Sequence, residues 1–271
     1  MGSETAGAIS LSMADLAIAT SLVLVAGVVS MALRLGLGRT LLLASVRTVV
    51  QLLLIGFILE WIFSLEDAIP LFCVLAVMVV FAGRAAVGRV ERTFDGIFWR
   101  SGLTLATTGL LTAVIVTAGI IGVDPWYKPQ YLLPLLGMIL GNSLTGMSLC
   151  LDKLLEDLDL RAGTIETDLA LGASRWEAAR EPVTNAIRRG MIPIINSMMV
   201  AGIVSLPGMM TGQILAGANP IEAVKYQVVV MFMLVASTAM GSTGVALLTY
   251  RRLFNAHHQL ERQAIAAKKV L

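Results

Sequence analysis

The sequence predicts an all-α, polytopic membrane protein with about seven transmembrane helices. Hydrophobic residues make up 57% of its 271 residues and charged residues only 14%, and the mean hydropathy is +0.83. The apolar residues form runs of about 20 residues, the length that one bilayer crossing requires. Arginine and lysine gather on every second connection between these runs, as the positive-inside rule predicts for a multi-pass protein.

Seven apolar runs have spanning length, and each must be helical because lipid offers the backbone no hydrogen-bonding partner. In chain order they cover residues 14–33, 40–63, 68–88, 102–123, 131–151, 190–215 and 226–249. Acidic rather than basic residues precede the first run, so we expect a span and not a secretory signal. The sixth run is the least regular, because Pro193, Pro207 and several glycines interrupt it.

The basic residues predict that the N-terminus lies outside and the C-terminus in the cytoplasm. On the predicted cytoplasmic side they fall within residues 34–39, 84–100, 153–189 and 251–269. Only Lys128 and Lys225 fall on the other side. Topology and anionic lipid explain these charges better than nucleic acid does. We therefore expect an inner (plasma) membrane protein with one transmembrane domain, residues 1–250, and a cytoplasmic tail, residues 251–271.

The longest polar interruption, residues 161–189, joins the fifth and sixth predicted spans on the cytoplasmic side. We expect Thr164 to cap a short helix that Gly172 ends, and Ser174 to start a second short helix through a capping box with Glu177. Such a rigid knob is suited to docking a soluble partner. The candidate coupling residues are Glu166, Asp168, Gly172, Ala173, Ser174, Trp176 and Glu177.

Several motifs that would indicate catalysis are absent from the sequence. No Gly-Lys pair occurs, so the chain has no P-loop, and it has no H-E-x-x-H or G-x-S-x-G motif. His257 and His258 lie in the polar tail, where a solvated helix face explains them better than a metal site. No predicted span carries a carboxylate near its middle, although ion-driven carriers generally need one. We therefore expect neither an enzyme nor a self-powered carrier.

The second span contributes three candidates for a transport pathway. Arg47 lies about 10 Å along it from residue 40, and Gln51 follows one turn later on the same face. Arg47 either snorkels to the interface or lines the pathway. Glu60, near the outer end, is either interfacial beside Trp61 or an attractant for cations.

The fifth span places Gly137 and Gly141 in G-x-x-x-G register, followed by Asn142 and Ser143. Glycines at this spacing predict a close helix contact, across which Asn142 can form a hydrogen bond. This structural interpretation is favoured over ligand binding, although Asn142 and Ser143 remain pathway candidates.

The broken sixth span is the better pathway candidate. Pro207 frees a backbone carbonyl in the segment that also holds Gln213, and such a break is tolerated only where protein or a cavity satisfies it. Met209 and Met210 are possible soft metal ligands, but methionine is also common core filler, which is the favoured interpretation.

The order from Glu166 to Trp176 resembles the EAA loop of ABC transporter permeases, in which a glutamate precedes a glycine by six residues. In that superfamily the loop forms a coupling helix that sits in a groove of the ATPase subunit. Thr167 and Asp168 replace the alanines that usually follow the glutamate.

A wider resemblance covers nearly the whole chain. It rests on RTVVQLLLIGFILEWIF from Arg47, PLLGMILGNSLTGMSL from Pro134, ETDLALGAS from Glu166 and SLPGMMTGQILAGANPIEAVKYQ from Ser205. These segments resemble the FetB-type permeases of the UPF0014 family, bacterial iron exporters related to plant aluminium-tolerance half-transporters. The resemblance implies an ATP-driven exporter of iron or another metal ion, in which two permease copies pair with two separately encoded ATPases. ATP and Mg²⁺ would bind the ATPase, and the permease no cofactor.

Two other classes of function fit the residues. One is a secondary carrier or channel that moves a small solute through Arg47, Gln51, Glu60 and the broken sixth span without ATP. The other is a membrane scaffold whose loop recruits a cytoplasmic partner. Iron follows from the resemblance alone, because no cluster with metal-ligand spacing occurs in the spans and no metal ligand is assigned.

Overall fold

The computed structural model describes residues 12–65, 68–255, 257 and 259–267. Over these residues the chain is all-α, as the sequence predicts, apart from one pair of two-residue strands. It divides into two compact units, which are considered separately. One comprises the described residues up to 65 together with Gln213–Ala218, and the other comprises the described residues of 68–212 and 219–271.

The first unit contains two long apolar helices, α1 (Met13–Ala32) and α2 (Gly38–Phe63). Ser12 starts α1 through a capping box, in which its N–H donates to the Asp15 carboxylate at 2.8 Å and its hydroxyl accepts from the Asp15 N–H at 3.3 Å. The turn between the helices is closed by the Leu37 N–H, which donates to the Ser30 hydroxyl at 3.0 Å. Exposed leucine, isoleucine and valine cover both helices, as expected of helices that contact lipid.

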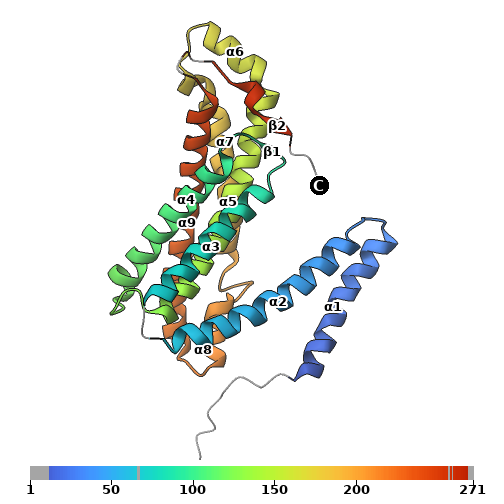
Figure 1. Cartoon of the computed structure of the whole chain (residues 1–271), viewed down its shortest axis with the longest axis vertical. Coiled ribbons are helices and arrows are strands. Elements are labelled where there is room, and N and C mark those ends of the chain that lie inside the picture. Colours follow the sequence, from blue (N-terminus) through green and yellow to red (C-terminus); the bar gives the residue numbers. More distant parts are fainter. Residues whose placement is uncertain (1–11, 66–67, 256, 258, 268–271) are drawn as a thin grey trace, which may run out of the picture. The chain divides into compact units, whose positions relative to one another are not determined.

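The second unit is a bundle in which α5 packs against its neighbours α3, α4, α7 and α9 (Figure 1). The bounds of these helices are Ala68–Gly88 for α3, Ile97–Val114 for α4, Pro129–Leu160 for α5, Arg175–Val200 for α7 and Pro220–Leu253 for α9. A π-helical segment, Ile115–Ile121, continues α4. Proline in the first turn of α5 and of α9 suits a position whose N–H has no helical partner.

The side chains of α5 form the centre of this bundle. Leu136, Ile139, Leu154 and Leu158 are all fully buried. Lipid tails are as apolar as leucine, so van der Waals packing rather than removal from water favours these contacts within a membrane.

Six helices of the described chain are long and apolar enough to cross a bilayer: α1, α2, α3, α4 with its π-helical continuation, α5 and α9. They correspond to the first five predicted runs and the seventh. The predicted sixth run, residues 190–215, is wrong as one continuous helix. Instead α7 ends at Val200, a non-helical segment covers residues 201–207, and α8 (Gly208–Leu215) follows.

Local backbone chemistry explains the interruption. Gly202 has a φ of +84°, a conformation that favours glycine, and Pro207 has no N–H to continue a helix. The segment satisfies part of its own backbone, since the Gly202 N–H donates to the Ser205 carbonyl at 2.8 Å and the Ser205 N–H donates to the Val200 carbonyl at 3.1 Å.

The C-terminal residues fold back onto the end of the bundle that carries α6 (Ala162–Ala170) (Figure 1). There β1 (Arg92–Thr93) pairs antiparallel with β2 (Ala266–Ala267), with Arg92 opposite Ala267. The Asp159 carboxylate lies 3.4 Å from Arg92 Nε and 3.1 Å from Arg262 Nε. The described part of the predicted tail is therefore held against α5 and the α3–α4 connection.

Some residues named in the sequence analysis fall outside this description. His257 is exposed in a turn, whereas His258 lies outside the described residues, as do the tail residues 268–271 and the N-terminal residues 1–11.

Helices α5, α7 and α9 approach one another closely at two glycines, Gly146 of α5 and Gly190 of α7. A methyl group added at Gly190 on α7 would lie 2.6 Å from the Gly146 carbonyl oxygen on α5 and 2.8 Å from the Ser242 hydroxyl on α9. A methyl group at Gly146 would lie 2.5 Å from the Thr238 methyl group. Real Cβ atoms do not approach other atoms so closely, so both positions require glycine.

The predicted contact at Gly137 and Gly141 is wrong in position. A methyl group at Gly137 would make an ordinary contact with Met78, at 3.5 Å, and one at Gly141 would meet nothing within 4 Å. Asn142 does not bond across a helix contact either, since its Nδ2 donates to the Met138 carbonyl of its own helix at 2.9 Å. Helices α5 and α7 instead approach each other closely at Gly146, on another face of α5.

We predict that Gly190→Ala destabilises the protein by about 1–3 kcal/mol, because the added methyl group forces α5, α7 and α9 apart. Gly141→Ala is the matched control, since it adds the same group to a helical glycine with open space and is expected to be neutral or stabilising by up to about 1 kcal/mol. Thermal unfolding in detergent measures both variants. Equal shifts in Tm would show that the Gly146–Gly190 contact does not limit packing.

Candidate functional site

The connection between α5 and α7 is a helix, a glycine corner and a second helix start, as predicted. α6 ends at Ala170, and Gly172, with a φ of +97°, turns the chain. The Gly172 N–H donates to the Leu169 carbonyl at 3.1 Å, and the Ala173 N–H to the Asp168 carbonyl at 3.0 Å. This pair of bonds is a Schellman motif, which satisfies the last carbonyls of α6.

Two details of the prediction are wrong. Thr164 is not the cap of α6, because α5 extends to Leu160 and α6 already begins at Ala162, with Arg161 at the cap position. The second helix is not short, because Ser174 begins the 26-residue helix α7. The corner thus joins the short helix α6 to the long helix α7, and only Arg161 separates α6 from α5.

Ser174 and Glu177 form the predicted capping box at the start of α7. The Ser174 N–H donates to the Glu177 carboxylate at 2.8 Å, and the Glu177 N–H donates to the Ser174 hydroxyl at 3.3 Å. The bond from the Ser174 N–H lowers the pKa of Glu177 below its ordinary value of 4.5, and the Ser174 side chain adds to this effect.

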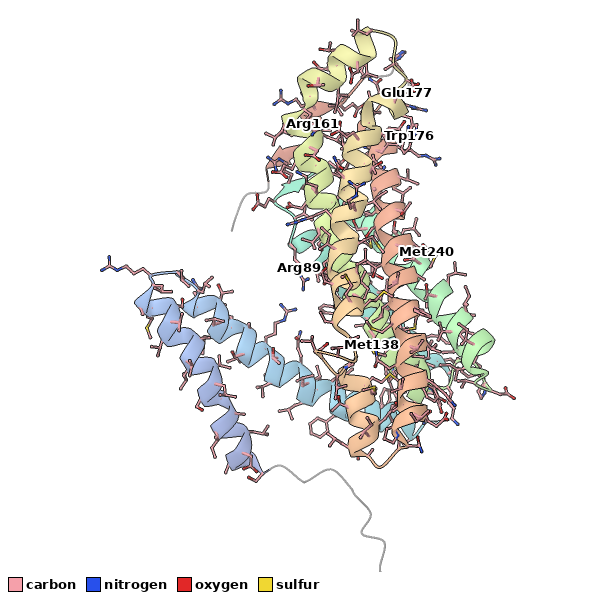
Figure 2. All side chains as sticks on the ribbon, turned by 180° about the vertical axis from the view of Figure 1, so that it is seen from behind. Arg89, Met138, Arg161, Trp176, Glu177 and Met240 are labelled. Carbon is pink, nitrogen blue, oxygen red and sulfur yellow. The ribbon has the colours of Figure 1, made fainter. Side chains whose placement is uncertain are left out.

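Contacts on the inner side of the corner hold α6 and α7 to the bundle. Ile165 of α6 is buried (2% exposed), and the Arg161 guanidinium forms an ion pair with Glu181 at 2.6 Å. The Trp176 ring packs on Tyr250 of α9, with centroids 5.5 Å apart and planes at 73°. Figure 2 shows Arg161, Trp176 and Glu177 near one end of the bundle and Met138 toward the other.

The outer side of the corner, residues 166–173, is here called the tip. Leu171 is its most exposed apolar side chain, at 83%. Glu166 is exposed and Asp168 half-buried. The tip therefore presents one exposed leucine beside carboxylates, on a backbone fixed by the Schellman motif and the capping box.

The break after α7 borders a cavity of about 380 Å³. Its walls come from the end of α7, the segment 201–207, the start of α8 and the first half of α9, and they include Met198, Gly202, Pro207, Met210, Gln227 and Met231. Of the sequence candidates, Pro207 and the buried Met210 line it, whereas Met209, which is half-buried, does not.

The remaining pathway candidates are not among the residues that line this cavity. Ser143 is fully buried on α5, and its hydroxyl oxygen has no hydrogen-bond partner among the described residues. Arg47, Gln51 and Glu60 are exposed on α2. That helix belongs to the first unit, to which Gln213 is also assigned.

Sequence reasoning missed Gln227, Gly146 and Gly190. Gln227 is 8% exposed, and its Oε1 has no partner among the described residues; a glutamine inside an apolar run was the available signal. Within the described part of the chain no group of three histidine, cysteine, aspartate or glutamate side chains is placed to hold a metal ion.

These features define a multi-pass α-helical membrane protein with a rigid helix–glycine–helix corner at one end of its bundle. The chain belongs to the UPF0014 family, because the sequence model described as "Uncharacterised protein family (UPF0014)" matches residues 13–254. No solved structure matches the chain.

Related proteins occur in bacteria and plants. "UPF0014 membrane protein slr1647" of Synechocystis is 38% identical over 83% of this chain and 87% of the relative. "Probable iron export permease protein FetB" of Escherichia coli is 32% identical over 91% of this chain and 93% of the relative. "Protein ALUMINUM SENSITIVE 3" of Arabidopsis thaliana is 31% identical over 93% of this chain and 90% of the relative.

We predict that Ser174→Ala frays the first turn of α7, because the Glu177 N–H loses its acceptor. Loss of a serine cap corresponds to about a five-fold faster amide exchange at residues 175–178. Thr164→Ala is the matched control, since Thr164 lies inside α6 and caps nothing. Hydrogen–deuterium exchange in nanodiscs measures both, and similar exchange in the two variants would contradict the capping role.

The capping box also predicts a pH dependence. Because folding lowers the pKa of Glu177, its contribution to stability is present above the unfolded value and is lost as the pH falls through the lower folded value. In Ser174→Ala the pKa should rise only part of the way toward 4.5, because the hydroxyl is lost while the bond from the backbone N–H of residue 174 remains. NMR titration of ¹³C-labelled glutamate measures the change, and an unaltered Glu177 titration would show that the Ser174 hydroxyl does not stabilise the carboxylate.

Proposed function

We propose that this chain is the permease subunit of an ATP-driven ABC exporter of iron or another metal ion. The observation that carries the proposal is the tip, an exposed apolar and acidic corner held between α6 and α7. Family membership and a relative named as a probable iron export permease support the class of transporter and the metal.

In this proposal the tip faces the cytoplasm and the N-terminus lies outside. The arginine residues around α6, β1 and the folded-back tail support that orientation. α5 has 32 residues and α9 has 34, which correspond to about 50 Å each, against about 30 Å of hydrocarbon. Their ends near α6 therefore extend beyond the membrane into the cytoplasm.

α7 makes the seventh crossing in this arrangement. Arg180, Arg188 and Arg189 make its first half too polar for a span judged by composition, yet it packs along both α5 and α9. Its first turns project with the tip, and its last turns, from Gly190 to Val200, carry mainly apolar side chains, many of them exposed.

The tip docks on a separate ATPase subunit, which binds ATP and Mg²⁺, and the permease binds neither. Two permease copies assemble with two ATPases. ATP closes the ATPases on each other, the tip moves with them, and α5 and α7 change which side of the membrane has access to the pathway. A continuous α7 supports this coupling, since it runs from the Ser174 cap to the break at residues 201–207.

We predict that Gly172→Val combined with Glu166→Lys abolishes stimulation of ATP hydrolysis and metal export by the assembled transporter. Valine is strained at a φ of +97° and distorts the tip, and lysine reverses its charge. Gly163→Ala, in the first turn of α6 with nothing within 4 Å, is the matched control and should retain both activities. ATPase assays and metal uptake by inside-out vesicles with the ATPase added measure the outcome.

Correct insertion of the double variant is checked by size-exclusion chromatography and helical circular dichroism. Unchanged export by an inserted double variant would overturn the coupling role. Export without any ATPase would indicate a secondary carrier or channel, and ATPase binding without export a scaffold.

A further inference from the structure

The chain reverses direction where α9 ends and returns toward α5. Phe254 forms an antiparallel bridge with Leu260, and both side chains are buried. The Glu261 N–H donates to the carbonyl of the buried Leu253 at 2.8 Å. The Arg252 guanidinium lies 2.7 Å from the Glu261 carboxylate. Apolar packing, a backbone hydrogen bond and an ion pair therefore fix this turn to the end of α9.

Beyond the turn, the tail contacts two other elements of the second unit. Each carboxylate oxygen of Asp159, on the last turn of α5, contacts a different arginine. Its Oδ1 lies 3.1 Å from Arg262 Nε of the tail, and its Oδ2 lies 3.4 Å from Arg92 Nε of the α3–α4 connection. Further along the tail, Ala266 pairs with Thr93 in the short sheet of β1 and β2 (Figure 1). The folded-back tail thus connects the ends of α9 and α5 with the α3–α4 connection.

A second carboxylate of α5 holds the same connection. The Asp152 side chain accepts a hydrogen bond from the Glu91 N–H at 3.1 Å. Asp152 and Asp159 are seven residues apart, so they lie on one face of α5, about 10 Å from each other. The α3–α4 connection is therefore attached to α5 at two successive points, and the tail shares the point that lies nearer the end of the helix.

That end of α5 is also the base of the tip. α5 ends at Leu160, and only Arg161 separates it from α6. A contact surface keeps its geometry only when the elements that support it are held in place. The side chains of Asp159 and Arg262 are 31% and 60% exposed, and ion pairs with this exposure contribute little to global stability. Their position at the base of the tip gives them a local effect instead.

We infer that Asp159 is a positioning residue, which together with the folded-back tail fixes the end of α5 from which α6 and the tip extend. The inference rests on the proposed function, in which a movement of the tip is coupled to ATP hydrolysis. A tip on a fixed base transmits a movement of the ATPase to α7, whereas a tip on a loose base moves without the helix. Loss of this link therefore lowers export more than ATP hydrolysis.

Hydrogen–deuterium exchange of the full chain in nanodiscs tests the local effect. Asp159→Asn removes the charge that both arginines contact and nearly preserves the size of the side chain. Exchange in α6 and the tip should become about two- to five-fold faster, as expected for two partly exposed ion pairs, and exchange in α9 should not change. Glu156→Gln is the matched control, since it neutralises a carboxylate of the same helix that pairs with Lys153. Equal exchange in the two variants, or faster exchange throughout α9, would overturn the inference.

A disulfide between the strands tests whether the tail provides the hold. Thr93→Cys combined with Ala266→Cys places two cysteines at directly paired positions of β1 and β2, where the Cα separation suits a disulfide. Cys73→Ser removes the exposed native cysteine. Added to Asp159→Asn, the oxidised pair should restore slow exchange in the tip, and dithiothreitol should reverse the effect. Fast exchange despite a disulfide confirmed by mass spectrometry would show that the tail does not position the tip.

Truncation after Glu261 is the second variant if Asp159→Asn does not fold. It removes Arg262 and β2 but keeps the turn around Leu260. Exchange should become faster in α6 and the tip alone, and unchanged exchange there would equally overturn the inference.

The assembled transporter separates this inference from the proposed function. Asp159→Asn should lower the amount of metal exported per ATP hydrolysed by about two-fold or more, and Glu156→Gln should not. An unchanged ratio in Asp159→Asn, beside a wild type that couples hydrolysis to export, would overturn the positioning role and leave the proposed function intact. A wild type without such coupling would contradict the proposed function, and the exchange measurements would still decide whether Asp159 positions the tip.

Discussion

The contact of Gly146 with Gly190 fixes the distance between α5 and α7, and the rest of the bundle depends on it. Neither position has room for a methyl group, and Ser242 of α9 occupies the remaining space. The Cys150 thiol donates to the Ser242 carbonyl at 3.4 Å beside it. In a membrane, such close backbone approach increases van der Waals contact where the hydrophobic effect does not favour association. The three helices are therefore joined near their middle rather than only at their ends.

Features determined by neighbouring residues could be predicted from the sequence. The apolar runs gave six spans because their length and composition are local properties. The Gly172 corner and the Ser174–Glu177 capping box were likewise predicted, since each depends on a few adjacent residues. Thr164 was assigned wrongly because α5 extends past residue 151, where the predicted apolar run ends, to Leu160.

Features that depend on which helix faces meet could not be predicted. The G-x-x-x-G pair predicted a close helix contact at Gly137 and Gly141, but the structure has it at Gly146. The sequence alone does not specify which face of α5 contacts α7. The cavity combines residues from Met198 to Phe232 across a break whose geometry follows from Gly202 and Pro207. Gln227 becomes notable only when its oxygen is found buried without a partner.

The position of Gly190 along α7 gives the proposed coupling a physical form. Gly190 lies about 24 Å from the Ser174 cap and about 15 Å from Val200, at 1.5 Å per residue. If a partner moves the tip while the Gly146–Gly190 contact holds, α7 pivots there, and its other end moves by about 0.6 of that distance in the opposite direction. Pro193, three residues past the pivot, leaves the Arg189 carbonyl without its helical partner. Bending at this point would reduce the movement that reaches residues 201–207. The stiffness of α7 on either side of Gly190 thus determines how far a movement at the tip reaches the broken segment.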